Sequence, residues 1–440
     1  MPSRGFLWGR LPRARLPRLR LPRGRLPRAG MITAGLAVVA VIGVLAAVPG
    51  KPQLAASPAD WLNGGLEAYA DTAGKWNSGE NAAVVALPGG RSLWLMGDSY
   101  DGPVDADGTV NPFRVHHVRN MLLLTSGSGH SFRIDDTIAG RAAHGAPGAV
   151  VQPASGSPRG SVASPAGGIV AGNAVEAIYD VFAPVPHGPP DVPTGTEIVT
   201  MPLASLTRPS TYTVAAGPSA GCRGNHADCV EWGVSMLRSA DCPPSTGLAS
   251  CTYVYGEEWP SASDPAHRLV EAVAGPGSLG APGRWWYDTA SGWTRAGGGT
   301  RATSRLASPL GGGTAINGFS VYQVSDGSYV ALSGGLGGIM AYYANSPSLD
   351  GASPARLFTG PGSRGLPSGF AYQFHIEPAY SSGPNVVMGF SVNSADHDQA
   401  CLDYAPYYDV AAYQPEFYSF TLPPSAGAVV TGRLPALRPR

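Results

Sequence analysis

Acidic side chains at the ends of apolar segments are the residues of this sequence best suited to chemistry. The clearest is Asp98 in the run Trp94 to Gly102 (WLMGDSYDG), where an apolar stretch ends in a glycine and then presents a carboxylate. Such an Asp either faces a pocket at the end of a strand or only caps the following turn. The candidates for a second, cooperating carboxylate are Glu231, Glu176 and Glu377. Glu231 precedes Trp232, and an apolar neighbour can raise a carboxyl pKa as a proton donor requires.

Two cooperating carboxylates are the machinery of glycoside hydrolysis, in which one protonates the leaving oxygen and the other activates water or attacks the sugar. Sugar hydroxyls could be bound near Asp98 by Asp101, His116, His117 and Arg119, although Arg119 could instead pair with an acidic neighbour in a loop. His375 is either a pocket residue or a buried imidazole. Glu257 and Glu258 precede Trp259-Pro260 and indicate a solvated loop. We expect no cofactor.

The tripeptide Gly97-Asp98-Ser99 also occurs in serine esterases of the Gly-Asp-Ser-Leu type, in which Ser99 would be the nucleophile. Asp264-Pro265-Ala266-His267 has the Asp-x-x-His form that these enzymes need. Their fold is a helix-flanked parallel sheet with the His near the C-terminus. Here few amphipathic helices are predicted and about 170 residues follow His267. The esterase is therefore the less favoured alternative.

Two further clusters have a functional and a plainer interpretation. Trp285, Trp286 and Trp293 could stack on sugar rings, but core packing is favoured for them. The cluster with metal-ligand character is Asp396, His397, Asp398 and Asp403, for which exposed loop charge is favoured. We therefore expect no metal site.

Cysteine spacing indicates two local disulfides. Cys222 and Cys229 are 7 residues apart, and Cys242 and Cys251 are 9 apart, which suits short closed loops. No Cys-x2-Cys pair is present, which argues against zinc ligation. Cys401 is left over and is predicted to be a buried thiol.

The N-terminal segment predicts export. Residues 1–30 are rich in Arg and Pro, residues 31–48 are an uncharged apolar run of a signal or single membrane anchor, and the first fifty residues hold nine Arg and no acidic residue. The remainder has 21 basic and 30 acidic residues, a net charge near −9, which argues against nucleic-acid binding. We expect an extracytoplasmic protein, secreted or held at the membrane through residues 31–48.

The exported part is predicted to be all-β. The 60 Gly and 42 Pro of the whole chain favour many short strands joined by turns. Five segments have the form of strand pairs: residues 82–97, 168–184, 230–256, 318–333 and 370–393. Their recurrence favours a β-propeller. We expect a linker and N-terminal closure over 49–79, one propeller domain over 80–422 and a flexible tail over 423–440, with surface loops at 139–167, 257–267 and 296–314.

The chain resembles the secreted family described as domain of unknown function 4185 and its neighbour 5005. Gly97-Asp98-Ser99 is similar to that family's Gly-Asp-Thr and is followed by Arg119-Asn120 and the apolar strand Met121 to Leu124. Further similar motifs are Trp232-Gly233, Tyr253 to Gly256, Phe319-Ser320-Val321, Phe374-His375 and Ser391-Val392-Asn393. Three features depart from the family: Ile376-Glu377-Pro378 follows His375, the second blade matches poorly, and Asp396-His397-Asp398 through Tyr408 is an insertion.

The resemblance implies a five-bladed β-propeller similar to furanosidases, some relatives of which cleave D-arabinan in bacterial envelopes. It implies a glycoside hydrolase acting on an arabinan-like or other envelope polysaccharide. Asp98 would be the base or nucleophile, and Asn120, Trp232, His375 and Asn393 would line the sugar site with the residues named above. The alternative is a non-catalytic carbohydrate-binding or scaffolding propeller, because a fold does not fix a function.

Overall fold

The computed structural model describes residues 53–111, 113–127, 130–183, 192–218, 229–259, 267–295, 318–335, 338–359, 369–394 and 410–435. The predicted basic segment 1–30 and apolar segment 31–48 lie outside these residues. None of the helices in the described part of the chain has the length and apolar character that a membrane span requires.

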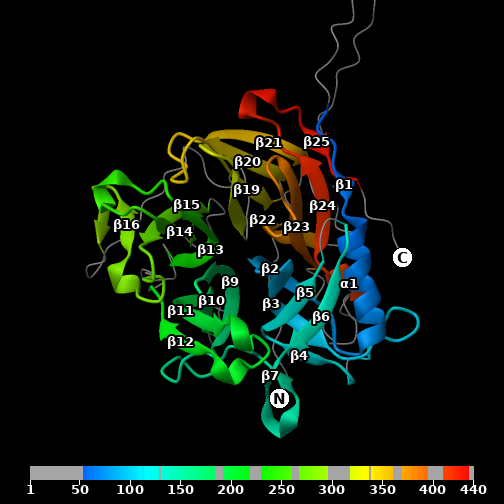
Figure 1. The fold of residues 1–440 in the computed structure, drawn as a ribbon. Coiled ribbons are helices and arrows are strands. Elements are labelled where there is room, and N and C mark those ends of the chain that lie inside the picture. The colour runs from blue at the N-terminus through cyan, green and yellow to red at the C-terminus, as the bar shows by residue number, and fades with distance from the viewer. Residues whose placement is uncertain are drawn as a thin grey trace, which may run out of the picture. The chain divides into compact units, whose positions relative to one another are not determined.

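Five sheets of four or five strands, antiparallel except for β25 (Gly432–Arg433) in blade 4, surround a central axis, so the chain is an all-β, five-bladed propeller (Figure 1). The inner strands of consecutive blades contact one another and close the ring. They are the first strands of their blades: β2 (Trp76–Leu87), β9 (Val162–Ala171), β13 (Cys229–Ser239), β18 (Phe319–Ser325) and β22 (Gly369–Ile376). The second strands are β3 (Arg91–Asp101), β10 (Ala174–Ala183), β14 (Cys251–Trp259), β19 (Ser328–Gly335) and β23 (Asn385–Ser394).

The outer strands complete each blade. Blade 1 adds β5 (Met121–Ser126) and β6 (Arg133–Ile138), with β4 (His116–Val118) paired to the end of β3. Blade 2 adds β11 (Val192–Pro202) and β12 (Thr213–Ala216), and blade 3 adds β15 (Arg268–Ala274), β16 (Trp286–Thr289) and β17 (Gly292–Arg295). Blade 4 adds β20 (Gly338–Ala344) and β21 (Ser353–Thr359), and blade 5 adds β24 (Glu416–Thr421). A small hairpin, β7 (Gly140–Arg141) and β8 (Pro147–Gly148), extends the loop between blades 1 and 2.

The hydrophobic core is divided into five clusters, each between two neighbouring blades. The strand pleat explains this division, because successive side chains of one strand point to opposite faces of its sheet. In β3, Leu93 and Leu95 pack toward blade 2, whereas Trp94 and Met96 pack toward blade 5. Both faces of the inner part of a blade are buried, so a strand such as β3 carries a continuous apolar run from Leu93 to Met96.

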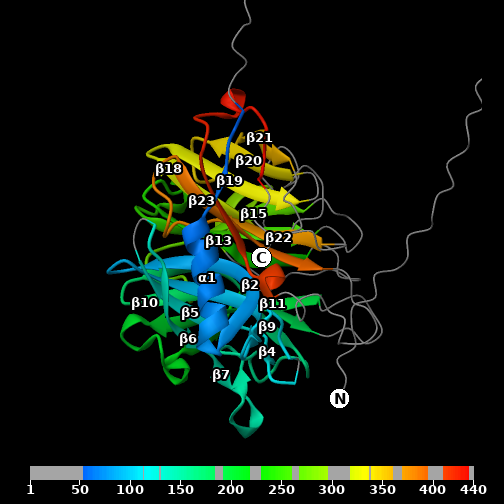
Figure 2. The same cartoon turned by 90° about the vertical axis from the view of Figure 1, so that its right-hand side faces the viewer.

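Two terminal segments close the ring. β1 (Ser57–Pro58) pairs with β24 in blade 5, and β25 (Gly432–Arg433) runs parallel to β21 in blade 4. The helix α1 (Asp60–Ala73) lies outside the ring and contacts strands of blades 1 and 5 (Figure 2). Its buried Leu62 and Leu66 join the core cluster between those blades.

All five predicted strand pairs are the two inner strands of the five blades. The tail prediction is wrong in part, because β25 lies within residues 423–440 and is paired. The loop predicted over 139–167 contains β7 and β8 and the start of the inner strand β9. Helix α1 was not predicted, and residues 296–314 lie outside the described residues.

Candidate active site

Asp98 has a carboxylate neighbour, Glu80, on the adjacent inner strand. Asp98 lies in the second strand β3, and Glu80 lies in β2, between the cross-strand pairs Gly79–Ser99 and Asn81–Met96. The register shifts between these two pairs, so Gly97 and Asp98 together stand against Glu80. The Glu80 side chain faces blade 5, where Tyr372 binds it. The innermost strand therefore supplies Glu80, and the predicted Asp98 stands one strand further out.

Two basic side chains hold the Asp98 carboxylate. Arg119 Nη1 donates a hydrogen bond of 2.9 Å to Asp98 Oδ2, and His117 Nε2 lies 3.4 Å from the same oxygen. Burial alone would raise the pKa of Asp98, but the hydrogen bonds and charges of His117 and Arg119 together bring it below its ordinary value. The carboxylate is therefore ionised at neutral pH. Its side chain is still 30 % exposed, so a ligand can reach it.

Glu80 has the opposite protonation state. Burial, followed by the negative charge of Asp98, raises its pKa to about 7. Two hydroxyls bind its Oε1 atom: Tyr372 from the inner strand of blade 5 at 2.6 Å, and Tyr413 at 3.1 Å. These hydrogen bonds lower the pKa of Glu80 without offsetting the rise. Glu80 can thus donate a proton while the neighbouring Asp98 carries a negative charge.

Gly97 makes room for this arrangement. A Cβ atom added at Gly97 would lie 2.9 Å from Glu80 Oε2 and 3.3 Å from its Cβ. The Glu80 side chain therefore passes directly over the backbone that leads into Asp98. The glycine of the Gly-Asp-Ser motif is required by a side chain 17 positions earlier in the sequence.

Blade 3 also carries an acidic pair on its first two strands. Glu231 on β13 is opposite Glu257 on β14, and the backbone N–H of Trp232 donates to Asp180 Oδ1 of blade 2 at 3.3 Å. Burial and the charge of Glu257 raise the pKa of Glu231 to about 8. Burial and the charge of Glu231 raise that of Asp180 well above its usual range. Glu257 is fully buried, pairs with His267 Nδ1 and accepts the N–H of Gly318 at 2.9 Å.

Both acidic pairs lie toward one end of the propeller. Neighbouring inner strands run in the same direction, as their side-chain contacts show. Glu80 and Glu231 lie near the beginnings of β2 and β13, and the returning second strands bring Asp98, Asp180 and Glu257 to that same end. The predicted solvated loop at Glu257 and Glu258 is wrong, because these side chains are 0 % and 3 % exposed within β14.

Two of the glutamates predicted as partners of Asp98 lie elsewhere. Glu176 is on β10 four residues before Asp180, which places it roughly 13 Å away along the strand. Burial raises the pKa of Glu176 by more than the charge of Arg238 lowers it. Glu377 follows β22, is fully buried and binds His375 Nε2 through Oε1 at 2.8 Å. His375 is thus a buried imidazole. Burial lowers the pKa of His375, but Glu377 and the carbonyl of Gln373 raise it by more, so the pKa lies above its ordinary value.

The predicted sugar-binding residues divide into two groups. His116 and Asp101 are paired across β4 and β3 beside the Asp98 site. Asn120 is buried, and its amide donates to the carbonyls of Val151 and Ala163 and accepts the Val151 N–H. Trp232 is 3 % exposed and packs edge to face on Tyr287. Asn120 and Trp232 therefore serve the packing of the blades. Asn393 lies in β23 opposite Phe370.

The residues of the esterase alternative are not arranged as a triad. The buried Ser99 hydroxyl donates to the carbonyl of Gly97 at 2.9 Å in blade 1, whereas His267 pairs with Glu257 in blade 3.

Trp285 is fully buried, in agreement with core packing. Asp396, His397, Asp398 and Asp403 lie outside the described residues. Among the described residues, no group of three or more His, Cys, Asp or Glu side chains could hold a metal ion.

The Cys242–Cys251 disulfide is formed as predicted, with a Cα–Cα distance of 6.0 Å. Cys229 is also disulfide-bonded, and its predicted partner Cys222 lies outside the described residues, as does Cys401.

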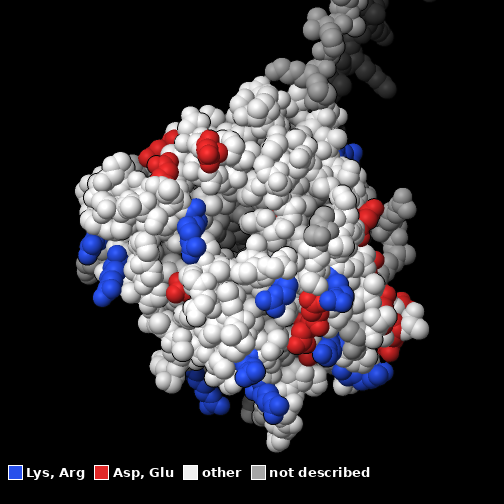
Figure 3. Space-filling model, viewed as in Figure 1, with Lys and Arg blue, Asp and Glu red and all other residues white. Residues whose placement is uncertain are grey.

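On the face in Figure 3, Lys and Arg side chains are scattered without a continuous patch. That face is hollowed near its centre, where the ribbons of β2, β9, β13 and β22 approach one another in Figure 1.

Glu80 is the site residue that sequence reasoning missed. The signal was present in the hairpin itself, because Glu80 and Asp98 are each nine positions from Gly89 at the centre of the turn. A hairpin that pairs around Pro88-Gly89-Gly90 brings these two carboxylates near one another on neighbouring strands, although the register shifts beside Glu80. The motif Gly-Glu on the first strand mirrors Gly-Asp on the second.

The fold and the paired carboxylates define a five-bladed propeller with a candidate acid–base site. The chain belongs to the family described as Domain of unknown function (DUF5005), whose model matches residues 65–421. No curated protein matches the chain.

Among solved structures, the chain is similar to a candidate hydrolase from Bacteroides ovatus ATCC 8483, with 15% identity, a TM-score of 0.55 and coverage of 79% of this chain and 86% of that one. This similarity supports the fold. A GH43_1 enzyme from Xanthomonas citri matches with 9% identity, a TM-score of 0.42 and coverage of 86% and 94%. An alpha-L-arabinanase from Penicillium chrysogenum matches with 10% identity, a TM-score of 0.35 and coverage of 85% and 98%. The last two scores are too low to carry an argument.

Proposed function

We propose that the protein is an exported glycoside hydrolase of an arabinan-like or other envelope polysaccharide, with Asp98 and Glu80 as its carboxylate pair. The observation that carries the proposal is the opposite protonation of these two neighbours. Asp98 is held ionised by Arg119 and His117, and Glu80 keeps its proton up to about pH 7. Pairs of carboxyls whose surroundings separate their pKa values identify the acid and the base of an active site.

In this mechanism Glu80 gives its proton to the glycosidic oxygen as the bond from that oxygen to the anomeric carbon breaks. Asp98 attacks the anomeric carbon and forms a glycosyl ester. Glu80, now ionised, takes a proton from water, whose oxygen displaces Asp98 and releases the sugar. Arg119 and His117 stabilise the carboxylate before attack and after release. His116 and Asp101 are placed to bind hydroxyls of the substrate.

We expect this covalent route and net retention of configuration, because the two carboxyls are close enough for the charge of Asp98 to raise the pKa of Glu80. Glu80 and Asp98 lie on neighbouring strands, which are roughly 4.8 Å apart. Retaining enzymes separate their two carboxyl groups by roughly 5–5.5 Å, and inverting enzymes by about 6.5–9.5 Å. We expect proton NMR of the first product to show the anomer of the substrate. Appearance of the opposite anomer would refute the role of Asp98 as nucleophile.

The test is hydrolysis of arabinan, arabinogalactan, xylan and other envelope glycans, followed by chromatography of released oligosaccharides. Asp98→Asn and Glu80→Gln should each reduce kcat by at least about a hundredfold, the scale of one acid–base group. Glu176→Gln, a carboxylate outside the pair, is the control and should stay near wild type. If Glu231→Gln abolishes release while Glu80→Gln does not, the proton donor is the blade 3 carboxyl and the pair is wrongly assigned.

Export is supported by chemistry at two places in the chain. The Arg-rich segment and apolar run of residues 1–48 have the polarity of a signal or anchor, and the Cys242–Cys251 disulfide suits an oxidising compartment. Fractionation of expressing cells should place the propeller outside the cytoplasm. Recovery of a reduced propeller from the cytoplasm would contradict the proposal.

A further inference from the structure

A second pocket lies on blade 4, away from the paired carboxylates. Its volume is about 380 Å³, within the range of small-ligand sites. Its twelve lining residues come from the start of β19, the end of β20, the following loop, the first residue of β21, and the segment Pro424 to Gly427. β19 begins at the end of the blade where the inner strand β18 finishes. The pocket and the carboxylate pair are therefore at opposite ends of the propeller.

The lining suits a neutral polyhydroxylated ligand. Ser328, Ser346, Ser353 and Ser425 offer hydroxyls, Asn345 offers an amide, and Asp350 offers a carboxylate. Hydroxyls and amides both donate and accept, as vicinal sugar hydroxyls do, and a carboxylate accepts from two of them. None of the twelve lining residues is Lys, Arg or His, which disfavours an anion. One carboxylate gives little of the negative charge that a divalent-cation site supplies, and the described residues include no group of three or more His, Cys, Asp or Glu that could hold a metal ion.

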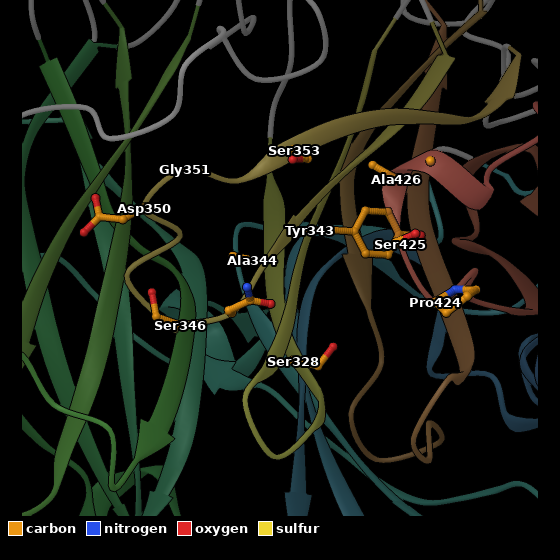
Figure 4. Close-up of a pocket in the computed structure, with 12 residues that line it drawn as sticks. Ser328, Tyr343, Ala344, Ser346, Asp350, Gly351, Ser353, Pro424, Ser425 and Ala426 are labelled. Atoms are coloured by element: carbon orange, nitrogen blue, oxygen red, sulfur yellow. The ribbon is translucent and has the colours of Figure 1, made fainter.

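Figure 4 shows how these groups face one another. The Tyr343 ring and Ser425 lie on one side, Asp350 and Ser346 on the other, and Ser353 and Ser328 lie between them. The Tyr343 ring gives the apolar face on which a sugar ring can pack. Ser353 is opposite Tyr343 on the paired strands β21 and β20, so its exposed side chain is at the edge of the pocket beside the ring.

The loop that supplies Asp350 is held in a defined shape. The hydroxyl of Tyr255, from blade 3, donates to the carbonyl of Pro347 at 2.7 Å. Leu349 is fully buried with a φ of 54°, a conformation that costs a branched residue of order 1 kcal/mol or more. Ser346, Ser348 and Asp350 form a chain of side-chain hydrogen bonds at 2.9 and 3.2 Å. The polar wall of the pocket is thus preorganised.

We propose that this pocket is a non-catalytic saccharide-binding site that holds one or two sugar units of a glycan. Its ligand is recognised by the Tyr343 ring, the Asp350 carboxylate and the surrounding serine hydroxyls. Because the pocket is remote from Glu80 and Asp98, it retains the protein on a polymer and takes no part in bond cleavage. The site does not depend on the proposed hydrolysis.

The experiment measures binding of arabinobiose, xylobiose and cellobiose to the Asp98→Asn protein by saturation-transfer NMR and titration calorimetry. At least one disaccharide should bind. Ser353→Tyr, which fills the pocket from its exposed edge, should abolish that binding, and Asp350→Ala should weaken it about tenfold, the scale of a hydrogen bond to a charged group. The control is Asp241→Asn, an exposed carboxylate outside the pocket, which should bind as the parent does.

Two results would overturn the proposal: none of the three disaccharides binds, or Ser353→Tyr and Asp350→Ala bind as tightly as the parent. Both substitutions are at exposed positions, and unchanged unfolding temperatures establish that the variants are folded. The hydrolysis of a short substrate by the Ser353→Tyr protein with an intact Asp98 separates the two sites. Loss of binding with unchanged kcat/KM assigns binding alone to the pocket.

Discussion

The Glu80 carboxyl is under two opposing influences. Burial and the neighbouring Asp98 charge raise its pKa to about 7, and the hydroxyls of Tyr372 and Tyr413 lower it. The balance sets the pH above which the proposed acid has lost its proton. An enzyme that depends on this acid should therefore lose kcat/KM as the pH rises through about 7.

Replacing Tyr372 by Phe tests this balance. The change removes the 2.6 Å hydrogen bond to Glu80 Oε1, which favours the ionised form, so the pKa of Glu80 should rise. The alkaline limb of the kcat/KM profile should then move to higher pH. Tyr413→Phe removes the longer bond of 3.1 Å and should produce a smaller shift in the same direction. A shift to lower pH, or none in either variant, would exclude Glu80 as the titrating acid.

Gly97 offers an independent test of the same pair. A methyl group at this position would meet Glu80 Oε2 at 2.9 Å and displace the carboxylate from its two tyrosine donors. Gly97→Ala should reduce kcat by about tenfold or more, since a misplaced catalytic group can cost a hundredfold. The unfolding temperature should change little. The control is Gly195→Ala, because an added methyl group there meets open space. Gly89→Ala is unsuitable, since the φ of 79° at Gly89 would strain an alanine. Full activity of Gly97→Ala would contradict the placement of Glu80.

At the scale of the elements, the inner hairpins were predictable and the outer strands largely were not. Residues 82–97 show two apolar runs around Pro-Gly-Gly, and such a pattern determines both the strands and the turn. Outer strands such as β12 and β16 have four residues each and lack such a pattern. Helix α1 was missed because its two glycines, Gly64 and Gly65, weaken the helical signal.

The candidate site was predictable only in part for a related reason. Asp98 was found because a motif ends its strand, and Arg119 and His117 because they are near it in sequence. The role of Glu80 depends on cross-strand register, and the tyrosines that bind it come from residues 372 and 413, almost 300 or more positions away. Asn120 was assigned to the substrate because a buried side chain that ties three backbone groups together has the same sequence signal as a ligand-binding amide.

One side chain of helix α1 makes two hydrogen bonds to the backbone of blade 5. Asn63 donates to the carbonyl of Phe417 and accepts its N–H, both at 3.0 Å, across 354 positions of the sequence. Asn63→Ala leaves the buried N–H of Phe417 without this acceptor and should reduce the free energy of unfolding by about 1–3 kcal/mol. Asp71→Ala, on the exposed side of the helix, should change it by less than about 0.5 kcal/mol. Chemical denaturation measures both, and equal effects would show that Asn63 is not the link.

In the part of the propeller that the structure describes, the hydrophobic core lies in five interfaces between neighbouring blades and not within single blades. Closure therefore matters more than the stability of any one sheet. The pairing of β1 with β24 and of β25 with β21 ties both terminal segments into blades 5 and 4. The same organisation places carboxyls from different blades in shared, poorly solvated surroundings, where Asp180 of blade 2 meets Glu231 and Glu257 of blade 3.

These buried acids make the stability of the ring depend on pH. The folded-state pKa of Glu80 is raised to about 7, that of Glu231 to about 8, and that of Asp180 well above 3.8. An acid with a raised pKa keeps its proton in the folded chain after the unfolded chain has lost it, so stability falls as the pH rises through this window. The raised pKa of His375 acts with the same sign. Asp98 acts with the opposite sign, and its contribution is lost only in acid.

We therefore expect the unfolding temperature to decrease steadily from about pH 5 to about pH 8 and to level off above the folded-state pKa values. Glu231→Gln and Glu80→Gln should each flatten this decrease, because a neutral amide at either site removes one titrating group from the ring. Glu67→Gln, on helix α1 away from both pairs, should leave the slope unchanged. Calorimetry across the pH range measures all four proteins. An unfolding temperature that rises between pH 5 and pH 8 would mean that these carboxyls are ionised in the folded protein, and the assignment of Glu80 as a proton donor would fail with them.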